Sequence, residues 1–266
     1  MFDEYLAEVK ITKSADTWKL YSYALQNFPK GGTREEILRF IDSNPAKETT
    51  KKLYLKILGN ALDFYGRKTK NIDRLIKGYR CNKPVEPCPT RLEVEKIWRT
   101  LKKPRDKLIF GLMAYNGLRV SEVCNLTVDD ILPDDRILLR DTKGKQDCIV
   151  PIVHSRVKIA LKEWLKIRKS TDKALFTTHF HKAMTLGSMK LFITRKCRKV
   201  GLPYHPHSFR RFFGNTLSRA GVPIQNICVA MRHKNIATTM GYLNINQEDT
   251  KSILETIYTK EESLYA

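Results

Sequence analysis

The sequence predicts a mainly α-helical chain with one small β-hairpin, divided into two domains. Apolar residues recur at helical spacing through most of the 266 residues, and Ser and Thr capping signals precede several of these runs. Residues 80–89 contain three prolines and have no periodicity, which is typical of a linker. Residues 136–140 and 146–152 are rich in β-forming residues and flank a Lys- and Gly-containing turn, as in a hairpin.

The linker sets the predicted domain bounds. Residues 1–80 form a helical N-terminal domain, residues 81–89 connect it, and residues 90–266 form the second domain. The N-terminal domain is expected to contain five helices: Phe2 to Val9, one capped by Ser14, one opened by the capping box Thr33-Arg34-Glu35-Glu36, one with Pro45 in its first turn, and Ile72 to Tyr79.

The second domain is expected to contain six helices in addition to the hairpin. Its predicted helices begin with a capping box at Thr90 and run to Leu101, from Arg105 to Tyr115, from His154 to Lys169, from Leu186 to Val200, through Arg210 to an end at Gly221, and from Gln247 to Tyr258. Asn116-Gly117 is expected to turn the chain after the second of these helices, which places Arg119 between two helices.

The charge is strongly basic in both domains. The formal net charge is +21; residues 1–84 have 17 Lys and Arg against 10 Asp and Glu, and the remainder has 32 against 18. A chain that is basic throughout suggests a polyanion held by two lobes. The basic residues predicted to contact this polyanion are Lys51, Lys52, Lys145, Lys190 and Lys196.

The cysteines and the hydropathy pattern exclude several classes of protein. None of the six cysteines forms a C-x-x-C pair, so no zinc site is predicted, and no metal or cofactor is expected. The longest apolar run, residues 108–115, is too short to span a bilayer. No signal peptide is evident, so we expect a cytoplasmic protein with free thiols, in a prokaryotic cell or in the host cell of a virus or plasmid.

Four polar residues near the C-terminal end form a conspicuous pattern. His207 and Arg210 are three residues apart, His233 lies 23 residues after Arg210, and Tyr242 lies nine residues after His233. On a helix, the first spacing places two side chains on one face. An Arg, two His and a Tyr could converge on one phosphodiester, with the cations on the phosphate oxygens and the phenol attacking phosphorus.

This pattern resembles the C-terminal signature of the tyrosine recombinase family (phage integrase, Xer-like). Two further motif pieces fit that family: Arg119 in Gly117-Leu118-Arg119, and Lys143 in the hairpin, 24 residues later. The resemblance is detailed over residues 85–260. It implies an N-terminal helical core-binding (SAM-like) lobe and a C-terminal catalytic lobe that together clamp a DNA duplex.

The resemblance implies a role for each motif residue. Arg119, Arg210 and His233 would stabilise charge on the non-bridging oxygens, and Glu122 would orient Arg119. Tyr242 is the expected nucleophile, His207 the candidate base and Lys143 the candidate acid for the leaving 5′-oxygen, with Lys145 as the alternative acid. Neither Tyr258 nor Tyr265 is preceded by a His nine residues earlier in the sequence, so neither is favoured as the nucleophile.

The function implied is metal- and ATP-independent DNA strand transfer through a 3′-phosphotyrosyl intermediate, by a tetramer at specific recombination sites. Many relatives have Gly where this chain has Arg232, and His where it has Arg211. These departures favour a mobile-element integrase over a Xer-type dimer resolution recombinase. A type IB topoisomerase and a non-catalytic DNA-binding protein stay open as alternatives.

Overall fold

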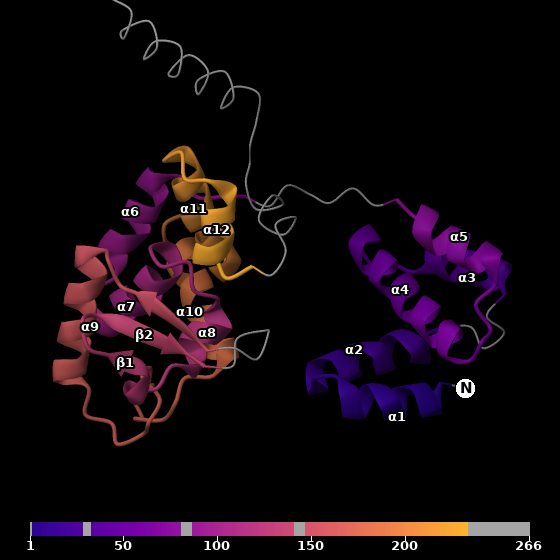
Figure 1. Cartoon of the computed structure of the whole chain (residues 1–266), viewed down its shortest axis with the longest axis horizontal. Coiled ribbons are helices and arrows are strands. Elements are labelled where there is room, and N and C mark those ends of the chain that lie inside the picture. Colours follow the sequence, from indigo (N-terminus) through magenta and orange to yellow (C-terminus); the bar gives the residue numbers. More distant parts are fainter. Residues whose placement is uncertain (1, 29–32, 81–86, 141–146, 234–266) are drawn as a thin grey trace, which may run out of the picture. The chain divides into compact units, whose positions relative to one another are not determined.

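The computed structural model describes residues 2–28, 33–80, 87–140 and 147–233, and the chain divides into two compact units, Met1–Val85 and Glu86–Ala266 (Figure 1). Over these residues the fold is mainly helical with one small three-stranded sheet, which confirms the predicted helical class and its small sheet. The division falls inside the predicted linker. The domain bounds stay a prediction, because residues 81–86 lie outside the described residues.

The first unit is entirely helical in its described residues. Its helices are α1 (Asp3–Thr12), α2 (Ala15–Gln26), α3 (Arg34–Ser43), α4 (Glu48–Phe64) and α5 (Lys70–Gly78). The long helix α4 forms the centre, with Leu55, Ile57 and Leu58 almost completely buried. It packs against α2 and α5, and the predicted core position Tyr54 is buried as well.

Local capping signals define three of these helix starts. The Ser14 hydroxyl accepts a hydrogen bond from the Thr17 N–H at 3.3 Å, and Thr69 caps α5 in the same way through the Ile72 N–H. Thr33 and Glu36 form the predicted capping box, in which the Glu36 carboxylate accepts from the Thr33 N–H at 3.0 Å. Each cap satisfies backbone donors that have no partner within the helix.

The prediction that Pro45 lies in the first turn of the fourth helix is wrong. Helix α4 begins at Glu48, with Lys47 as its N-cap residue. The side-chain oxygen of Asn44 accepts a hydrogen bond from the Ala46 N–H at 2.9 Å, which closes a turn across Pro45. This local bond stabilises a non-helical backbone just where the proline alone suggested a helix start.

The second unit combines a small sheet with helices. Its elements are α6 (Arg91–Thr100), α7 (Pro104–Ala114), α8 (Val120–Asn125), the 3-10 helix η1 (Val128–Asp130), β1 (Ile131–Leu132), β2 (Arg136–Leu139), β3 (Cys148–Pro151), α9 (Ser155–Ile167), α10 (Leu186–Lys199), α11 (Pro206–Arg219) and α12 (Ile224–Ala230). The strands are antiparallel in the order β1-β2-β3, so the predicted hairpin has a third, two-residue strand that the sequence did not reveal.

Helix α7 is the centre of this unit. Seven consecutive residues, 108–114, are buried, and the helix packs against α6, α8, α9 and α11. A helix with no exposed stripe over this stretch must be surrounded on every side. Because α7 is fixed in this way, the turn that follows it is fixed too, and that turn begins the candidate site.

Candidate active site

Helix α11 supplies two of the predicted site residues from its first two turns. Phe209 is fully buried in the core and Phe212 nearly so, while Phe213 and Leu217 pack against Ile227 and Met231 of the α12 segment. This packing fixes the helix from two sides.

Arg210 lies on the buried side of α11. It is only 1% exposed, and its guanidinium donates hydrogen bonds to the backbone carbonyls of Gly117 and Met231. These carbonyls belong to the turn after α7 and to the end of α12, so one arginine links three segments that are distant in the sequence. A guanidinium has five N–H donors in one plane, so it can bind several acceptors at once.

The turn after α7 depends on Gly117. Its φ is +62°, in the left-handed region, and a Cβ on this residue would collide with the ring of Phe213. The Leu118 N–H donates to the Leu112 carbonyl at 3.0 Å, which closes the turn against α7. Both the backbone conformation and the close approach of α11 therefore require glycine at this position.

We expect Gly117→Ala to destabilise the protein and to impair the site together. The left-handed conformation costs an alanine about 1–2 kcal/mol, and forcing Cβ against Phe213 adds roughly 1–3 kcal/mol. The measurement is the free energy of unfolding in urea. Gly221→Ala is the matched control, because Gly221 has a φ of +73° but no heavy atom within 4 Å of the point that a Cβ would occupy. Equal losses in the two variants would contradict the packing argument.

Arg119 and Glu122 form an ion pair at the start of α8. The Arg119 N–H donates to Glu122 Oε2 at 2.8 Å, and Arg119 Nη1 donates to Glu122 Oε1 at 2.5 Å. A second arginine, Arg232, donates to Glu122 Oε2 at 3.0 Å. Arg119 Nη2 also donates to the Arg232 carbonyl at 3.3 Å, so the two arginines are linked through both the carboxylate and the backbone.

The carboxylate of Glu122 is ionised in this setting. Burial disfavours its charge, but the Arg232 guanidinium and the hydrogen bonds from Arg119 outweigh that cost and lower its pKa below the usual value. The charge of Glu122 therefore balances one of the surrounding guanidinium groups at neutral pH.

His233 lies beside this cluster of positive charges. Its backbone N–H donates to the Cys228 carbonyl at 3.0 Å. Burial and the nearby charges of Arg210, Arg119 and Arg232 lower the pKa of His233 from 6.5 to about 4, although Glu122 acts in the opposite direction. The imidazole is therefore neutral at pH 7 and carries one N–H donor and one acceptor nitrogen.

The lowered pKa of His233 predicts that stability falls as the pH drops from 6.5 towards 4. In this window the unfolded chain binds a proton at His233 that the folded protein does not, which favours unfolding. The free energy of unfolding, measured in urea, should fall less between pH 7 and pH 5 in His233→Gln than in the wild type. The lowered pKa of Glu122 acts in a lower window, below 4.5. His179→Gln, in an exposed loop, is the control, and an unchanged pH dependence in His233→Gln would contradict the prediction.

The other predicted site residues divide into two groups. His207 is exposed in the first turn of α11, and its ring centroid lies 6.4 Å from that of His205. Lys143 and Tyr242, with the alternative acid Lys145, lie outside the described residues. The structure thus brings Arg119, Glu122, Arg210 and His233 together, and the roles of all these residues stay predictions.

Sequence reasoning did not include Arg232 in the site. Its guanidinium donates to the Ala230 carbonyl at 3.0 Å and to the Gly117 carbonyl at 3.1 Å as well as to Glu122. Its side chain is 8% exposed. The available signal was its place directly before His233, at a position where many relatives have glycine.

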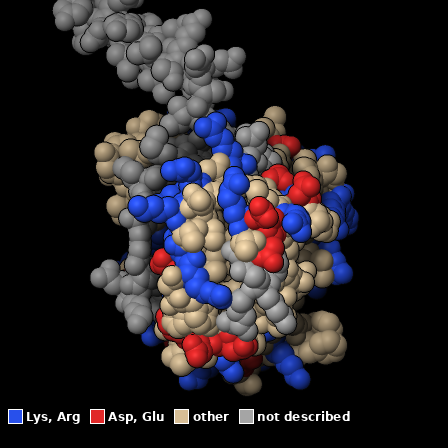
Figure 2. Space-filling model, turned by 90° about the vertical axis from the view of Figure 1, so that its right-hand side faces the viewer, with Lys and Arg blue, Asp and Glu red and all other residues tan. Residues whose placement is uncertain are grey.

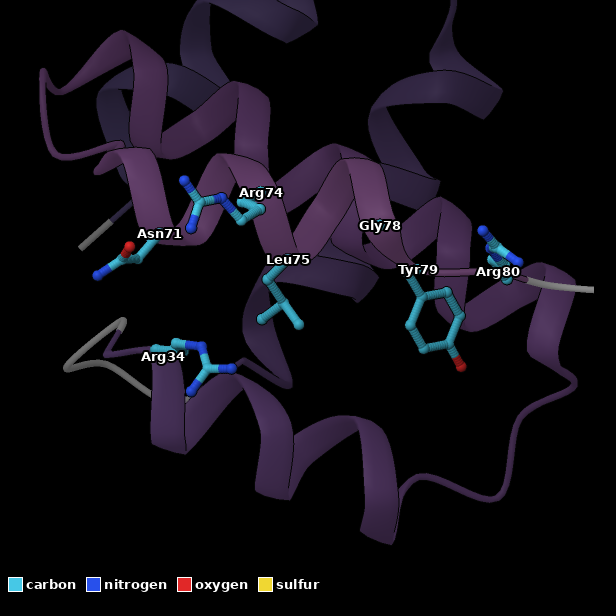
Figure 3. A pocket seen from close by; sticks show the side chains of 7 residues that line it. All are labelled: Arg34, Asn71, Arg74, Leu75, Gly78, Tyr79 and Arg80. Atoms are coloured by element: carbon cyan, nitrogen blue, oxygen red, sulfur yellow. The ribbon is translucent and has the colours of Figure 1, made fainter.

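A basic groove in the first unit was also missed. It has a volume of about 540 Å³, and Figure 3 shows the Leu75 and Tyr79 side chains of the α5 segment pointing into it opposite Arg34 at the start of α3. Its other lining residues are Asn71, Arg74, Gly78 and Arg80. Three guanidinium groups around a concave surface suit an anion such as a phosphate group.

The predicted lysine contacts have different surroundings. Lys52 and Lys190 are exposed, whereas Lys51 pairs with Glu48 at 3.1 Å and Lys196 lies 3.8 Å from Asp106. Part of the charge of the last two is therefore balanced within the protein. On the face shown in Figure 2, Lys and Arg side chains are spread over much of the surface, and acidic side chains lie among them towards the upper right and along the lower edge.

Two features are absent from the part of the chain that the structure describes. No helix within residues 2–28, 33–80, 87–140 and 147–233 combines the length and apolar character needed to cross a membrane. Over the same ranges, no group of three or more His, Cys, Asp or Glu is arranged to hold a metal ion.

Comparisons with known proteins agree with the motif pattern. The model of the phage integrase family matches residues 90–249, well over half of the chain. Among curated proteins, a tyrosine recombinase XerA from Pyrococcus horikoshii is 29% identical over 91% of this chain and 88% of the relative. A tyrosine recombinase from Thermosipho africanus is 27% identical over 94% of this chain and 95% of the relative.

Solved structures with the same fold include recombinases and integrases. The Tn1549 transposon integrase in complex with transposon right end DNA has a TM-score of 0.78 at 17% identity, covering 97% of this chain and 98% of that one. A lambda integrase dimer bound to a COC′ core site has a TM-score of 0.74 at 17% identity, covering 91% and 75%. A XerA recombinase has a TM-score of 0.59 at 24% identity, covering 98% and 96%.

Proposed function

The chain belongs to the phage integrase family of tyrosine recombinases, and on that premise we propose that it cuts and rejoins DNA at specific sites through a 3′-phosphotyrosyl intermediate. The main support for the proposal is that Arg210 and Arg119 both connect the turn after α7 to the backbone at the end of α12. Arg210 binds the Gly117 carbonyl, Arg119 follows Gly117 by two residues, and Arg119 binds the backbone beside His233. Two guanidinium groups and an imidazole at one place suit a phosphate whose oxygens gain charge during reaction.

The proposed reaction is a transesterification. The Tyr242 hydroxyl attacks phosphorus, the bond to the 5′-oxygen breaks, and the phenolic proton passes to His207. Lys143 gives a proton to the leaving 5′-oxygen, which becomes a hydroxyl. An ordinary phenol has a pKa of about 10, so a base is needed for attack at neutral pH. The energy of the broken phosphodiester bond is kept in the covalent link, and reversal of the step rejoins the strand.

The neutral state of His233 supports its role as a hydrogen-bond donor rather than as a fixed charge. With a pKa of about 4 it donates through one ring nitrogen at pH 7. A bound phosphate adds negative charge beside it and would favour the protonated form. Arg119 and Arg210 supply the permanent positive charge, since a guanidinium does not lose its proton in proteins.

We propose double-stranded DNA as the substrate and a tetramer as the active assembly on two recombination sites. The Tn1549 and lambda integrase structures are DNA complexes, and one of them contains a dimer. The net charge of +21 and the basic groove around Arg34, Arg74 and Arg80 support binding to a polyanion.

Two biological outcomes fit this chemistry. Arg232 and Arg211 at the two departures from the family pattern favour integration or excision of a mobile element. The likeness to XerA over 91% of the chain favours the second candidate, Xer-type dimer resolution. The two candidates can be distinguished by assaying recombination between two sites on one plasmid and between sites on separate plasmids. A resolution system acts on the first arrangement, so recombination between separate plasmids would favour the mobile-element candidate. Relaxation of plasmids that carry one site or none would favour a topoisomerase instead.

The test of the proposed function uses nicked suicide duplexes from the DNA that flanks the gene. The nick lets a short fragment with the 5′-hydroxyl diffuse away after cleavage, so the protein stays attached to the DNA. We expect a protein-sized shift on a denaturing gel, and peptide mapping should place the nucleotide on Tyr242. The adduct should form in EDTA. Tight binding without any adduct would overturn the enzyme proposal in favour of a DNA-binding regulator, and cleavage restored only by a divalent ion would overturn the metal-free mechanism.

A further inference from the structure

Arg232 has an unusual backbone conformation for its residue type. Its φ is +54°, in the left-handed region that residues with a Cβ rarely adopt. The turn begins where α12 ends, since the Arg232 N–H donates to the Val229 carbonyl at 2.9 Å and the His233 N–H to the Cys228 carbonyl at 3.0 Å. Glycine would take this conformation without strain. An arginine at such a place needs contacts that keep it there, and its side chain makes them.

The Arg232 guanidinium connects three parts of the site. It donates to Glu122 Oε2 at 3.0 Å and to the Gly117 carbonyl at 3.1 Å, and it returns to its own turn through the Ala230 carbonyl at 3.0 Å. The side chains of Arg232 and Glu122 are 8% and 11% exposed, so this ion pair is largely shielded from water. These three acceptors are protein atoms, so the guanidinium is engaged within the protein.

The contacts of Arg232 lead to both predicted catalytic arginines. Glu122 holds Arg119 with its other oxygen at 2.5 Å, and the Arg232 carbonyl accepts from Arg119 Nη2 at 3.3 Å. The Gly117 carbonyl, which Arg232 shares with Arg210, provides the connection to α11. Loss of the Arg232 side chain would leave Glu122 bound to Arg119 alone, through the Arg119 backbone N–H and Nη1, and would leave one donor fewer on the Gly117 carbonyl.

We propose that Arg232 is a positioning residue, which holds Glu122, and through it Arg119, in the orientation needed to bind the scissile phosphate. The inference rests on the proposed recombinase function and deepens it. Arg232 itself does not touch the phosphate. A misplacement of about 1 Å in a reacting group can cost about 10²-fold in rate, which sets the scale of the effect.

Arg232 also contributes to the electrostatic setting of His233. The charged groups that face this imidazole are Arg210 from α11, Arg119 from the start of α8, Arg232 from the adjoining turn, and Glu122 from α8. Removing the Arg232 charge leaves Glu122 less balanced, so the pKa of His233 should rise from about 4 towards its ordinary value of 6.5. This shift reports the charge of Arg232, whereas the cleavage rate at unchanged DNA affinity reports the placement of Arg119.

The decisive variant is Arg232→Gly, because glycine suits a φ of +54° and the substitution removes the side chain without straining the backbone. We expect single-turnover cleavage of the suicide duplex to fall about 10- to 100-fold, with DNA affinity unchanged. Arg232→Lys keeps the charge and should recover part of the rate. Asp134→Gly is the matched control, since Asp134 also has a positive φ, of 62°, but its side chain is 84% exposed in the β1–β2 turn.

A second arm needs no activity. The pKa of His233, followed by NMR in the free protein, should rise in Arg232→Gly and stay unchanged in Asp134→Gly. Wild-type cleavage rate and an unmoved His233 pKa in Arg232→Gly would overturn the proposal. Parallel loss of DNA affinity and cleavage would also overturn it, because Arg232 would then contact DNA directly. If the wild type forms no adduct, the proposed function fails, and the NMR arm still decides whether Arg232 sets the environment of His233.

Discussion

Replacing Tyr242 with phenylalanine is expected to abolish the covalent protein–DNA adduct while leaving DNA binding intact. The substitution removes one hydroxyl oxygen, which is the nucleophile in the proposed reaction, and phenylalanine offers no atom that could replace it. DNA affinity depends on the many Lys and Arg of a chain with a net charge of +21, and none of these is changed. The measurement is adduct formation on a nicked duplex in a denaturing gel, beside a mobility-shift titration.

Two tyrosines serve as controls for this experiment. Tyr258→Phe and Tyr265→Phe change the same functional group near the C-terminal end of the chain, but neither residue has a His nine positions ahead. Both variants should form the adduct as the wild type does. An adduct that persists in Tyr242→Phe and disappears in one of the controls would transfer the nucleophile to that tyrosine and disprove the assignment by spacing.

Replacing Arg210 with alanine is expected to lower the rate of strand cleavage by a factor of roughly 10²–10³. This is the usual loss when one hydrogen-bond donor to the charge that develops in the transition state is removed. The variant also loses some stability, because the Met231 carbonyl is left without this donor at a cost of about 1–3 kcal/mol. The Gly117 carbonyl keeps its hydrogen bond from Arg232 at 3.1 Å. Single-turnover cleavage at saturating protein measures the catalytic loss apart from binding.

Arg219→Ala is the matched control for Arg210→Ala. It removes the same charge from the same helix, but Arg219 is exposed in the last turn of α11. Its cleavage rate should stay close to that of the wild type. Arg210→Lys separates charge from geometry, since a single ammonium group does not reproduce a planar fork that reaches two carbonyls. A rate in Arg210→Lys equal to that of the wild type would show that charge alone is sufficient.

Helix starts were predictable where a short polar pattern decides them. The capping boxes at Thr33 and Thr90 involve residues three positions apart, so the sequence contains the whole interaction. Pro45 misled because the Asn44 side chain closes a competing turn. Strand β1 was missed because two residues, Ile131 and Leu132, are too few to show a period.

The sequence motif predicted that Arg119, Glu122, Arg210 and His233 belong to one group, but it did not predict most of the hydrogen bonds that connect them. Arg119 and Glu122 are three residues apart, and a pairing between them was expected. Arg232 contacts Gly117 and Glu122, which are more than 100 residues away. Its left-handed φ comes from the way the chain leaves α12, and no local pattern encodes that path. The ion pairs of Lys51 and Lys196 likewise became visible only with the fold.

The Gly117 carbonyl accepts hydrogen bonds from both Arg210 and Arg232, and Met231 and Ala230 bind the same two guanidinium groups through their carbonyls as well. Every amino acid has a backbone carbonyl, so no substitution at these acceptor positions deletes the atom that is bound. Substitutions at Gly117, Ala230 and Met231 can therefore keep these carbonyl hydrogen bonds, provided that the path of the backbone is kept, whereas the Glu122 carboxylate is an acceptor that a substitution does remove. We therefore expect the residues that set this path, foremost Gly117 and the Phe213 ring that it accommodates, to tolerate substitution least.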